Sequence, residues 1–182
     1  MTATGLKVPA AAARPSSGPA ITRGTIGDLD AVIEVHSSGW GSPPPELTVR
    51  QFRHHLRRGE LWTAWAGGVL VGTISLADTP YHDWADGWPT EEPALYCDHL
   101  VVRPGTMTGN TLMDFACSLA AATGRHCLRG TVRPDRPRVI TWYQRSYGVR
   151  IVGSCMRHEP PVRRLLIQSD HPRRHIGAAK PC

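Results

Sequence analysis

The sequence predicts a single α/β domain with a mixed sheet of about seven strands flanked by about four helices. Three observations support this class: an early pair of strands joined by two glycines, an alternation of short β-type runs with helical patterns after it, and a length of 182 residues, which fits one domain. Hydrophobic residues make up 41% of the chain, which is enough for a core.

The N-terminal half is expected to begin with a disordered lead over residues 1–19, which are small, proline-interrupted and without periodicity. A strand follows at 20–23, and Asp28 is expected to cap a helix. The helical spacing of that helix comes from Leu29, Val32, Ile33 and His36. Three prolines at 43–45 end it, and Thr48 is expected to begin a second helix that runs to 58.

Residues 61–66 and 69–77 predict a hairpin, because the Gly67-Gly68 pair between them is a tight-turn signal. The remaining strands are expected at 95–102, 127–132, 150–156 and 162–168, and helices at 108–123 and 136–147. The domain would therefore span 20–169, with a basic tail from 170 to 182.

The composition is typical of a protein of the cell interior, so we expect a cytoplasmic location. No apolar run approaches the roughly 18 residues of a membrane helix, and the start of the chain lacks a signal pattern. The five cysteines contain no CxxC pair, so we expect reduced thiols and no metal. The net charge of +6 has two explanations: arginine-rich codon usage or an anionic partner.

Five segments follow one another in a familiar order: ITRGTIGDLDAVIEV (21–35), VLVGTISLAD (69–78), LYCDHLVVRP (95–104), LMDFACSLAAATG (112–124) and WYQRSYGV (142–149). Together they resemble the GNAT superfamily of N-acetyltransferases over roughly residues 20–168. The resemblance implies the GNAT fold, in which the fourth and fifth strands part and the acyl-pantetheine arm of acetyl-CoA or another acyl-CoA lies between them. The backbone of Leu100, Val101 and Val102 would pair with that arm. The implied acceptor is a small-molecule amine, and a homodimer is one assembly that we consider.

The resemblance also implies a glycine-rich turn that binds the pyrophosphate of coenzyme A at a helix start. The corresponding segment is RPGTMTGN (103–110), in which only Gly109 falls on a family glycine and the turn is about three residues shorter. Other candidates for anion contacts are Gly105, Thr106, Thr108 and Asn110. Three interpretations stay open: an acyl-CoA enzyme, a related enzyme that uses an acyl group on an acyl carrier protein or performs another reaction, and a non-catalytic binding module.

The resemblance places the catalytic base on the fourth strand and the acid on the last helix. Asp98 stands where family members often carry a glutamate, and the alternative is a surface carboxylate. His99 points to the opposite face unless a β-bulge intervenes, and it is otherwise a packed side chain. Tyr143 is the acid if one inserted residue shifts the register, because its phenol suits a thiolate leaving group and Gln144 at the unshifted position does not.

The stretch 79–93 is long for a loop inside a compact domain, which favours a functional role. Its aromatic and acidic side chains predict the binding site of a cationic amine. The residues proposed to contact this substrate are Tyr81, His82, Trp84 and Trp88. The basic tail lacks interleaved aromatics, so we expect neither a nucleic-acid nor a membrane partner.

Overall fold

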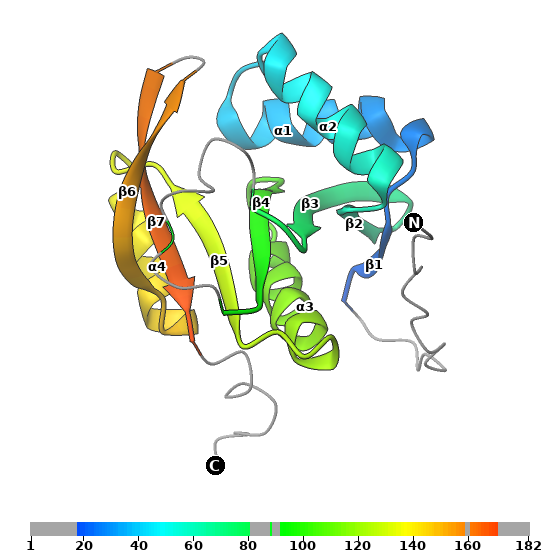
Figure 1. The fold of residues 1–182 in the computed structure, drawn as a ribbon. Coiled ribbons are helices and arrows are strands. Elements are labelled where there is room, and N and C mark those ends of the chain that lie inside the picture. Colours follow the sequence, from blue (N-terminus) through cyan, green and yellow to red (C-terminus); the bar gives the residue numbers. More distant parts are fainter. Residues whose placement is uncertain (1–17, 81–87, 89–91, 159–160, 171–182) are drawn as a thin grey trace, which may run out of the picture.

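The computed structural model describes residues 18–80, 88, 92–158 and 161–170 (Figure 1). The strands are β1 (Ala20–Arg23), β2 (Leu61–Ala66), β3 (Val69–Ala77), β4 (Ala94–Val102), β5 (Cys127–Val132), β6 (Arg150–His158) and β7 (Pro161–Ser169). The helices are η1 (Ile26–Asp28, a 3-10 helix), α1 (Leu29–Trp40), α2 (Glu46–Arg58), α3 (Thr108–Ala122) and α4 (Pro137–Tyr147). The predicted mixed α/β class is confirmed, and the expected lead and tail fall almost entirely outside the described residues.

The strands form one sheet in the order β1-β2-β3-β4-β5-β7-β6. Neighbouring strands are antiparallel except for β4 and β5, which are parallel. Helices α1 and α2 cover one face of the sheet, and α3 and α4 cover the other (Figure 1). The parallel pair therefore lies in the middle of the sheet, with helices on both sides.

Local sequence accounts for most element ends. Gly67 and Gly68 both have positive φ, which the tight turn between β2 and β3 requires. Asp28 is the N-cap residue of α1, as predicted, but its side chain makes no capping bond to that helix: its carboxylate accepts hydrogen bonds from the amide and hydroxyl of Thr25 and closes η1. Helix α2 begins two residues before Thr48, directly after the last proline of the loop, and its first acidic residue suits the positive helix start.

The two faces of the sheet have separate apolar cores. One is formed with α3 and includes the fully buried Leu112, and the other is formed with α1 and α2 and includes the fully buried Phe52. Helix α3 approaches β3 closely because Gly72 has no side chain. A Cβ at that position would lie 2.9 Å from side-chain carbons of both Leu112 and Thr108.

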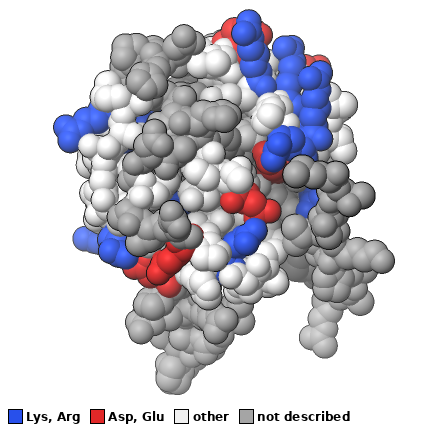
Figure 2. Space-filling view, in the orientation of Figure 1, with Lys and Arg blue, Asp and Glu red and all other residues white. Residues whose placement is uncertain are grey.

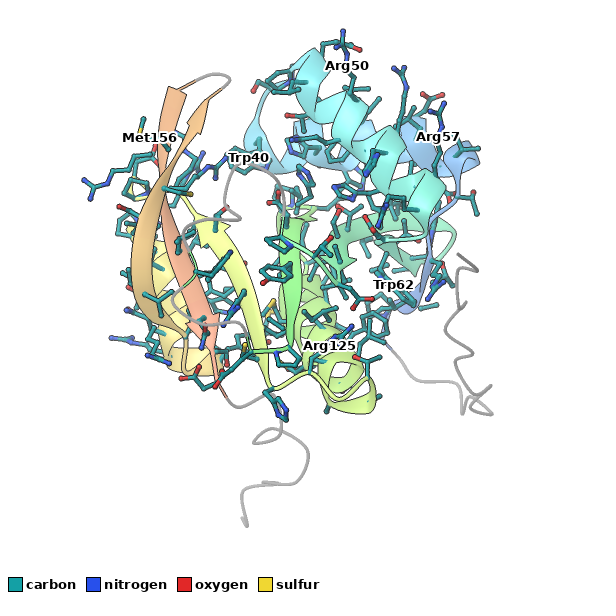
Figure 3. All side chains as sticks on the ribbon, viewed as in Figure 1. Trp40, Arg50, Arg57, Trp62, Arg125 and Met156 are labelled. Atoms are coloured by element: carbon teal, nitrogen blue, oxygen red, sulfur yellow. The ribbon has the colours of Figure 1, made fainter. Side chains whose placement is uncertain are left out.

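Basic side chains are concentrated on α2. Arg50, Arg53 and Arg57 are exposed, and Figure 2 shows a group of basic side chains over this helix, at the upper right. Figure 3 shows Arg50 and Arg57 pointing away from the sheet. Within the described ranges, no helix is long and apolar enough to cross a membrane, and no three His, Cys, Asp or Glu side chains are grouped to hold a metal ion.

Candidate active site

The parallel strands β4 and β5 pair over only the first four residues of β4. The register runs from Ala94 opposite Cys127 to Cys97 opposite Gly130 and then stops, although both strands continue. Gly130 permits close approach at the last pair, since a Cβ there would lie 2.9 Å from the carbonyl oxygen of Cys97. The parallel pairing and the divergence beyond it agree with the fold that the resemblance implied.

A β-bulge interrupts β4 directly after this pair. On the β3 side, Ser75 lies opposite Asp98 and Thr73 lies opposite Val101, so β4 has one residue more than β3 in this stretch. His99 has φ of 51°, the one positive value among the non-glycine residues that the structure describes. A left-handed conformation costs a non-glycine residue about 1–2 kcal/mol, so the surrounding packing must hold it in place.

The bulge turns Asp98 and His99 toward the same side of the sheet. Cys97 and Leu100 both pack with the core on the α3 face, whereas Val101 packs with the core on the α1–α2 face. In a regular strand, positions 97 and 100 would point to opposite faces. The β-bulge that Asp98 and His99 need in order to face one site is therefore present.

A cavity of about 520 Å³ lies where β4 and β5 part. Its walls come from the end of α1 and the loop after it, from the diverging strands, and from the segment between β5 and α4 together with β7. It brings together the three predicted catalytic residues and the predicted donor-binding strand. These residues are Asp98, His99, Leu100, Val101, Val102 and Tyr143.

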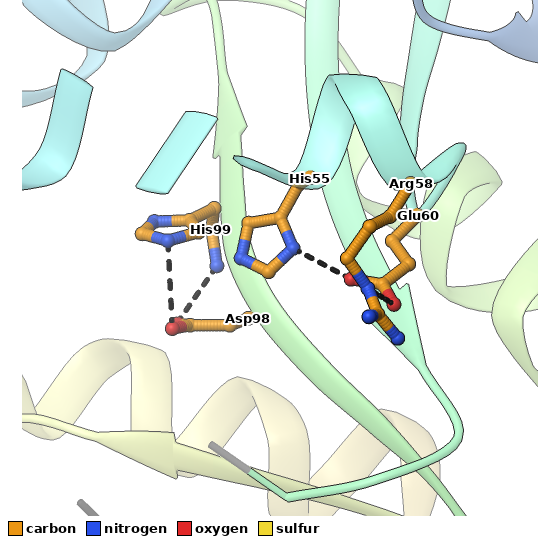
Figure 4. Close-up of polar contacts among 5 residues, drawn as sticks. All are labelled: His55, Arg58, Glu60, Asp98 and His99. Carbon is orange, nitrogen blue, oxygen red and sulfur yellow. Dashed lines mark hydrogen bonds and ion pairs between the residues drawn. The ribbon is translucent and has the colours of Figure 1, made fainter. Parts of the chain in front are cut away.

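Asp98 and His99 lie side by side in this cavity (Figure 4). Asp98 Oδ1 accepts a hydrogen bond from the backbone amide of His99 at 2.8 Å, and His99 Nε2 lies 3.6 Å from Asp98 Oδ2. The Asp98 side chain is 24% exposed, whereas that of His99 is 6% exposed and packs edge-on against Phe52. Asp98 is therefore the better placed of the two to receive a proton from a substrate.

A second histidine, His55 of α2, lies next to His99. Their ring centroids are 5.7 Å apart, and His55 Nδ1 is hydrogen-bonded to Glu60 at 2.9 Å (Figure 4). Burial lowers the pKa of His55 despite the opposing effect of Glu60, and burial lowers the pKa of His36 despite the opposing effect of Asp98. Because His36 and His55 are neutral at pH 7, they place no positive charge beside Asp98 that would weaken it as a base.

Tyr143 reaches the cavity from α4, whereas Gln144 is exposed on the outside of that helix. Burial raises the pKa of the Tyr143 phenol, and the nearby Asp98 carboxylate adds to the rise, so the hydroxyl keeps its proton. Burial likewise raises the pKa of the Cys97 thiol, which also lines the cavity. A thiol that stays protonated is a poor nucleophile.

The turn expected to bind pyrophosphate is tied to the rest of the domain by its own side chains. Arg103 donates from Nε to the carbonyl of Leu70 at 2.7 Å and pairs with Glu34 at 2.6 Å, so its charge is directed toward α1. Thr106 donates its hydroxyl to the Arg103 carbonyl at 2.8 Å, and Gly105 next to it has φ of 79°. The turn therefore offers no uncommitted cation.

The start of α3 contributes little beyond backbone amides. Thr108 is buried beside Gly72, Asn110 accepts a hydrogen bond from the indole of Trp142 at 3.0 Å, and Gly109 lies next to the same indole. The Asn110 amide already donates to the Met107 carbonyl at 3.2 Å, so the first-turn amides left for an anion are those of Thr108 and Gly109. None of the residues predicted to contact phosphate lines the cavity.

Three of the predicted acceptor residues lie outside the described ranges: Tyr81, His82 and Trp84. Trp88 is half-buried and does not line the cavity. It packs against Tyr96, with 5.9 Å between ring centroids, and under the guanidinium of Arg129. The structure thus places Trp88 beside the paired half of β4, on the sheet itself.

The sequence did not predict the residues that form the cavity wall opposite β4. Trp40, the proline loop after it, and Arg133 and Arg136 after β5 all line the cavity. The run of prolines predicts a stiff loop, but no sequence pattern near it predicts that the loop lines the same cavity as the end of β5. Gly39 lets α1 reach β4, since a Cβ there would lie 2.5 Å from a side-chain carbon of Val101.

Comparison with solved structures identifies the architecture, whereas no protein-family model and no curated protein sequence matches the chain. The loading GNATL domain of CurA from Lyngbya majuscula superposes with a TM-score of 0.65 at 12% identity, covering 84% of this chain and 97% of that one. Ard1 from Thermoplasma volcanium gives a TM-score of 0.63 at 15% identity, covering 83% and 96%.

A GNAT-family acetyltransferase from Listeria monocytogenes 4b F2365 gives a TM-score of 0.62 at 18% identity, covering 82% of this chain and 93% of that one. In all three comparisons the superposition extends over nearly the whole solved chain. The chain therefore has the GNAT fold, as the sequence resemblance predicted.

Proposed function

We propose that the protein is an N-acyltransferase that moves an acyl group, typically acetyl, from coenzyme A to a small amine in a ternary complex. The observation that carries the proposal is the meeting of Asp98, Tyr143 and the parted stretch of β4 in one cavity. The fold shared with solved acetyltransferases supports the same class of reaction.

The parted strands support the position of the donor. Leu100, Val101 and Val102 line the cavity beyond the last residue pair of β4 and β5. Backbone groups of β4 that face this gap can pair with the amides of a pantetheine arm, as a peptide adds to a sheet edge. The thioester end of the arm would then share the cavity with Asp98 and Tyr143.

The residues of the cavity suit direct attack. The substrate ammonium gives a proton to Asp98, directly or through water, and its nitrogen forms a bond to the thioester carbon as the carbon–sulfur bond breaks. Tyr143 donates a proton or a hydrogen bond to the departing sulfur. The ammonium loses two protons and the sulfur gains one, so one proton is released for each amide and thiol formed. The protonated Cys97 thiol favours this route over an acyl-cysteine intermediate.

In the turn from Arg103 to Asn110, side chains that could bind phosphate are already engaged within the domain. This favours a second candidate, in which the acyl group is carried by an acyl carrier protein. Pantetheine on a carrier protein lacks the adenosine diphosphate portion of coenzyme A, so it needs less of a phosphate site. The similarity to the loading domain of CurA agrees with this alternative. A non-catalytic binding module is a third candidate, which the presence of Asp98 and Tyr143 in one cavity disfavours.

A calorimetric titration with acetyl-CoA tests the leading proposal, with Gly109→Val as the variant. A Cβ at Gly109 would meet only the Trp142 ring, at 3.8 Å, so the helix should tolerate the change while its start becomes obstructed. We expect acetyl-CoA to bind the unaltered protein and to bind Gly109→Val at least about tenfold more weakly, or about 1.4 kcal/mol.

Ser118→Val is the matched control, because it adds a β-branched residue to an exposed position of α3 away from its start. Its affinity for acetyl-CoA should be unchanged. Equal affinity of Gly109→Val and the unaltered protein would show that the phosphates are held elsewhere. No binding to the unaltered protein would overturn the coenzyme A proposal in favour of a carrier-bound donor.

A further inference from the structure

One rim of the cavity carries arginines that the reaction described above does not use. Arg133 and Arg136 come from the segment between β5 and α4, and Arg164 comes from β7. Across the cavity, the loop after α1 contributes only uncharged side chains to the lining. Among the described lining residues, Asp98 is the only carboxylate. The cavity thus has a carboxylate on β4 and a positively charged rim.

Arg136 is the best presented of these cations. It is exposed, and its guanidinium carbon lies 5.0 Å from the centre of the Trp40 ring. Figure 3 shows Trp40 between α1 and the β6–β7 ribbon. An aromatic ring under a guanidinium stabilises its position and leaves its N–H edges available. In the described part of the chain, Arg136 forms no ion pair, whereas Arg133 pairs with Asp135.

The same place is the start of α4. Arg136 immediately precedes the helix, which runs for 11 residues from Pro137 to Tyr147. The partial positive charge of a helix start adds to that of the guanidinium. A bidentate contact with arginine is the usual way in which proteins bind a carboxylate or a phosphate. The stacked guanidinium at this helix start can therefore offer its N–H edges to one anionic group.

We propose that this rim binds the anionic end of the acceptor, so that the substrate is an amine that also carries a carboxylate or a phosphate. The proposal rests on the proposed function, in which Asp98 receives the proton of the ammonium end. The substrate would span the cavity, with its ammonium near Asp98 and its anion at Arg136. The anion is assigned to the acceptor because, in the proposed function, the donor phosphates bind at the start of α3, which does not line the cavity.

Binding measured without any acyl donor tests this proposal independently of catalysis. Calorimetry would compare three amines of similar length: an ω-amino carboxylate, an aminoalkyl phosphate and an alkylamine. We expect at least one anionic amine to bind about tenfold or more tightly than the alkylamine. The carboxylate and phosphate arms identify which anion the site prefers.

Arg136→Gln should abolish this preference, whereas Arg138→Gln should retain it. Arg138 is the matched control, because it is an exposed arginine of the same helix that does not line the cavity. The proposal is overturned if the alkylamine binds as tightly as both anionic amines, or if the two variants behave alike. It is also overturned if Arg136→Gln weakens acetyl-CoA binding and leaves amine binding unchanged, since the rim would then hold the donor.

Discussion

The two halves of strand β4 differ although they belong to one element. The first half, Ala94–Cys97, pairs with β5 throughout and with β3 at Tyr96 and Cys97, and it has buried side chains such as Leu95. The second half pairs only with β3, contains the bulge at His99 and lines the cavity. A single extra residue separates a stretch that stabilises the sheet from a stretch that offers side chains and backbone to ligands.

The polar groups around the two halves differ in the same way. Beside the first half, the buried Arg129 donates to Gln168 at 2.9 Å and to the Tyr96 hydroxyl at 3.3 Å, so a permanent charge is fixed by hydrogen bonds. Beside the second half, His36 and His55 are buried with lowered pKa values. The first environment thus holds an arginine fixed by hydrogen bonds, whereas the second holds buried histidines that can change their charge.

The largest expected effect is on turnover, from Asp98→Asn in the second half. Asn keeps an oxygen that can accept the hydrogen bond from the His99 amide but cannot take a proton from the substrate. We expect kcat/KM to fall by about 10²–10⁴-fold, with the free energy of unfolding changed by less than about 1 kcal/mol. Steady-state kinetics and urea unfolding measure the two quantities. Unchanged turnover would remove Asp98 from the reaction.

Leu95→Ala tests the first half. Leu95 is buried in the core against α3, so the substitution should lower the free energy of unfolding by about 2–5 kcal/mol. The kcat of the molecules that remain folded should stay within about twofold of the original, because Leu95 does not line the cavity. If kcat fell as strongly as in Asp98→Asn, the first half of β4 would also take part in activity, and the contrast between the two halves would be wrong.

Tyr143→Phe removes the hydroxyl and keeps the ring, whose packing against the α3-side core should persist. A loss of about tenfold to a thousandfold in kcat, with little change in stability, is expected from the loss of a proton donor. Gln144→Ala on the exposed side of α4 is the control and should leave kcat unchanged. Equal kcat in Tyr143→Phe and the control would assign Tyr143 to packing alone.

The smallest expected effect is a pH dependence of stability from the second half. His36 and His55 have lowered pKa values when folded, so the unfolded chain binds more protons below about pH 6.5. The contribution of these neutral histidines to the free energy of unfolding is therefore fully present above that pH and is lost as the pH falls further. His55→Gln should make unfolding curves at pH 7.5 and 5.5 differ less than in the unaltered protein. An equal or larger difference would contradict a neutral, buried His55.

Much of the fold was predictable because the signals were local. The hairpin of β2 and β3 was predicted to the residue, since Gly67 and Gly68 mark its turn, and β5 was predicted to the residue as well. The start of α2 was wrong because Thr48 suggested a cap, whereas the proline loop already sets the helix direction at Glu46. Asp28 was correctly placed at the N-cap of α1, but Thr25 competes for its carboxylate, so the side chain does not cap that helix.

The cavity was only half predictable. The resemblance pointed to Asp98, His99 and Tyr143, and the structure places all three in the cavity lining; their roles remain predictions. Trp40 and Arg136 were missed because they meet only through the fold, nearly a hundred residues apart in the chain. No local pattern of residues encodes a cation over an aromatic ring on another helix.

The position of β7 has a consequence for how the protein is made. β7 is the last strand along the chain but lies between β5 and β6 in the sheet. A chain emerging from the ribosome therefore holds β5 as an open edge until residues 161–169 arrive, and such edges invite pairing with other molecules. The Arg164 side of the cavity is completed in the same late step. A chain shortened before residue 161 lacks β7, so β6 loses the strand with which it pairs. A chain shortened after residue 170 keeps all the strands of the sheet.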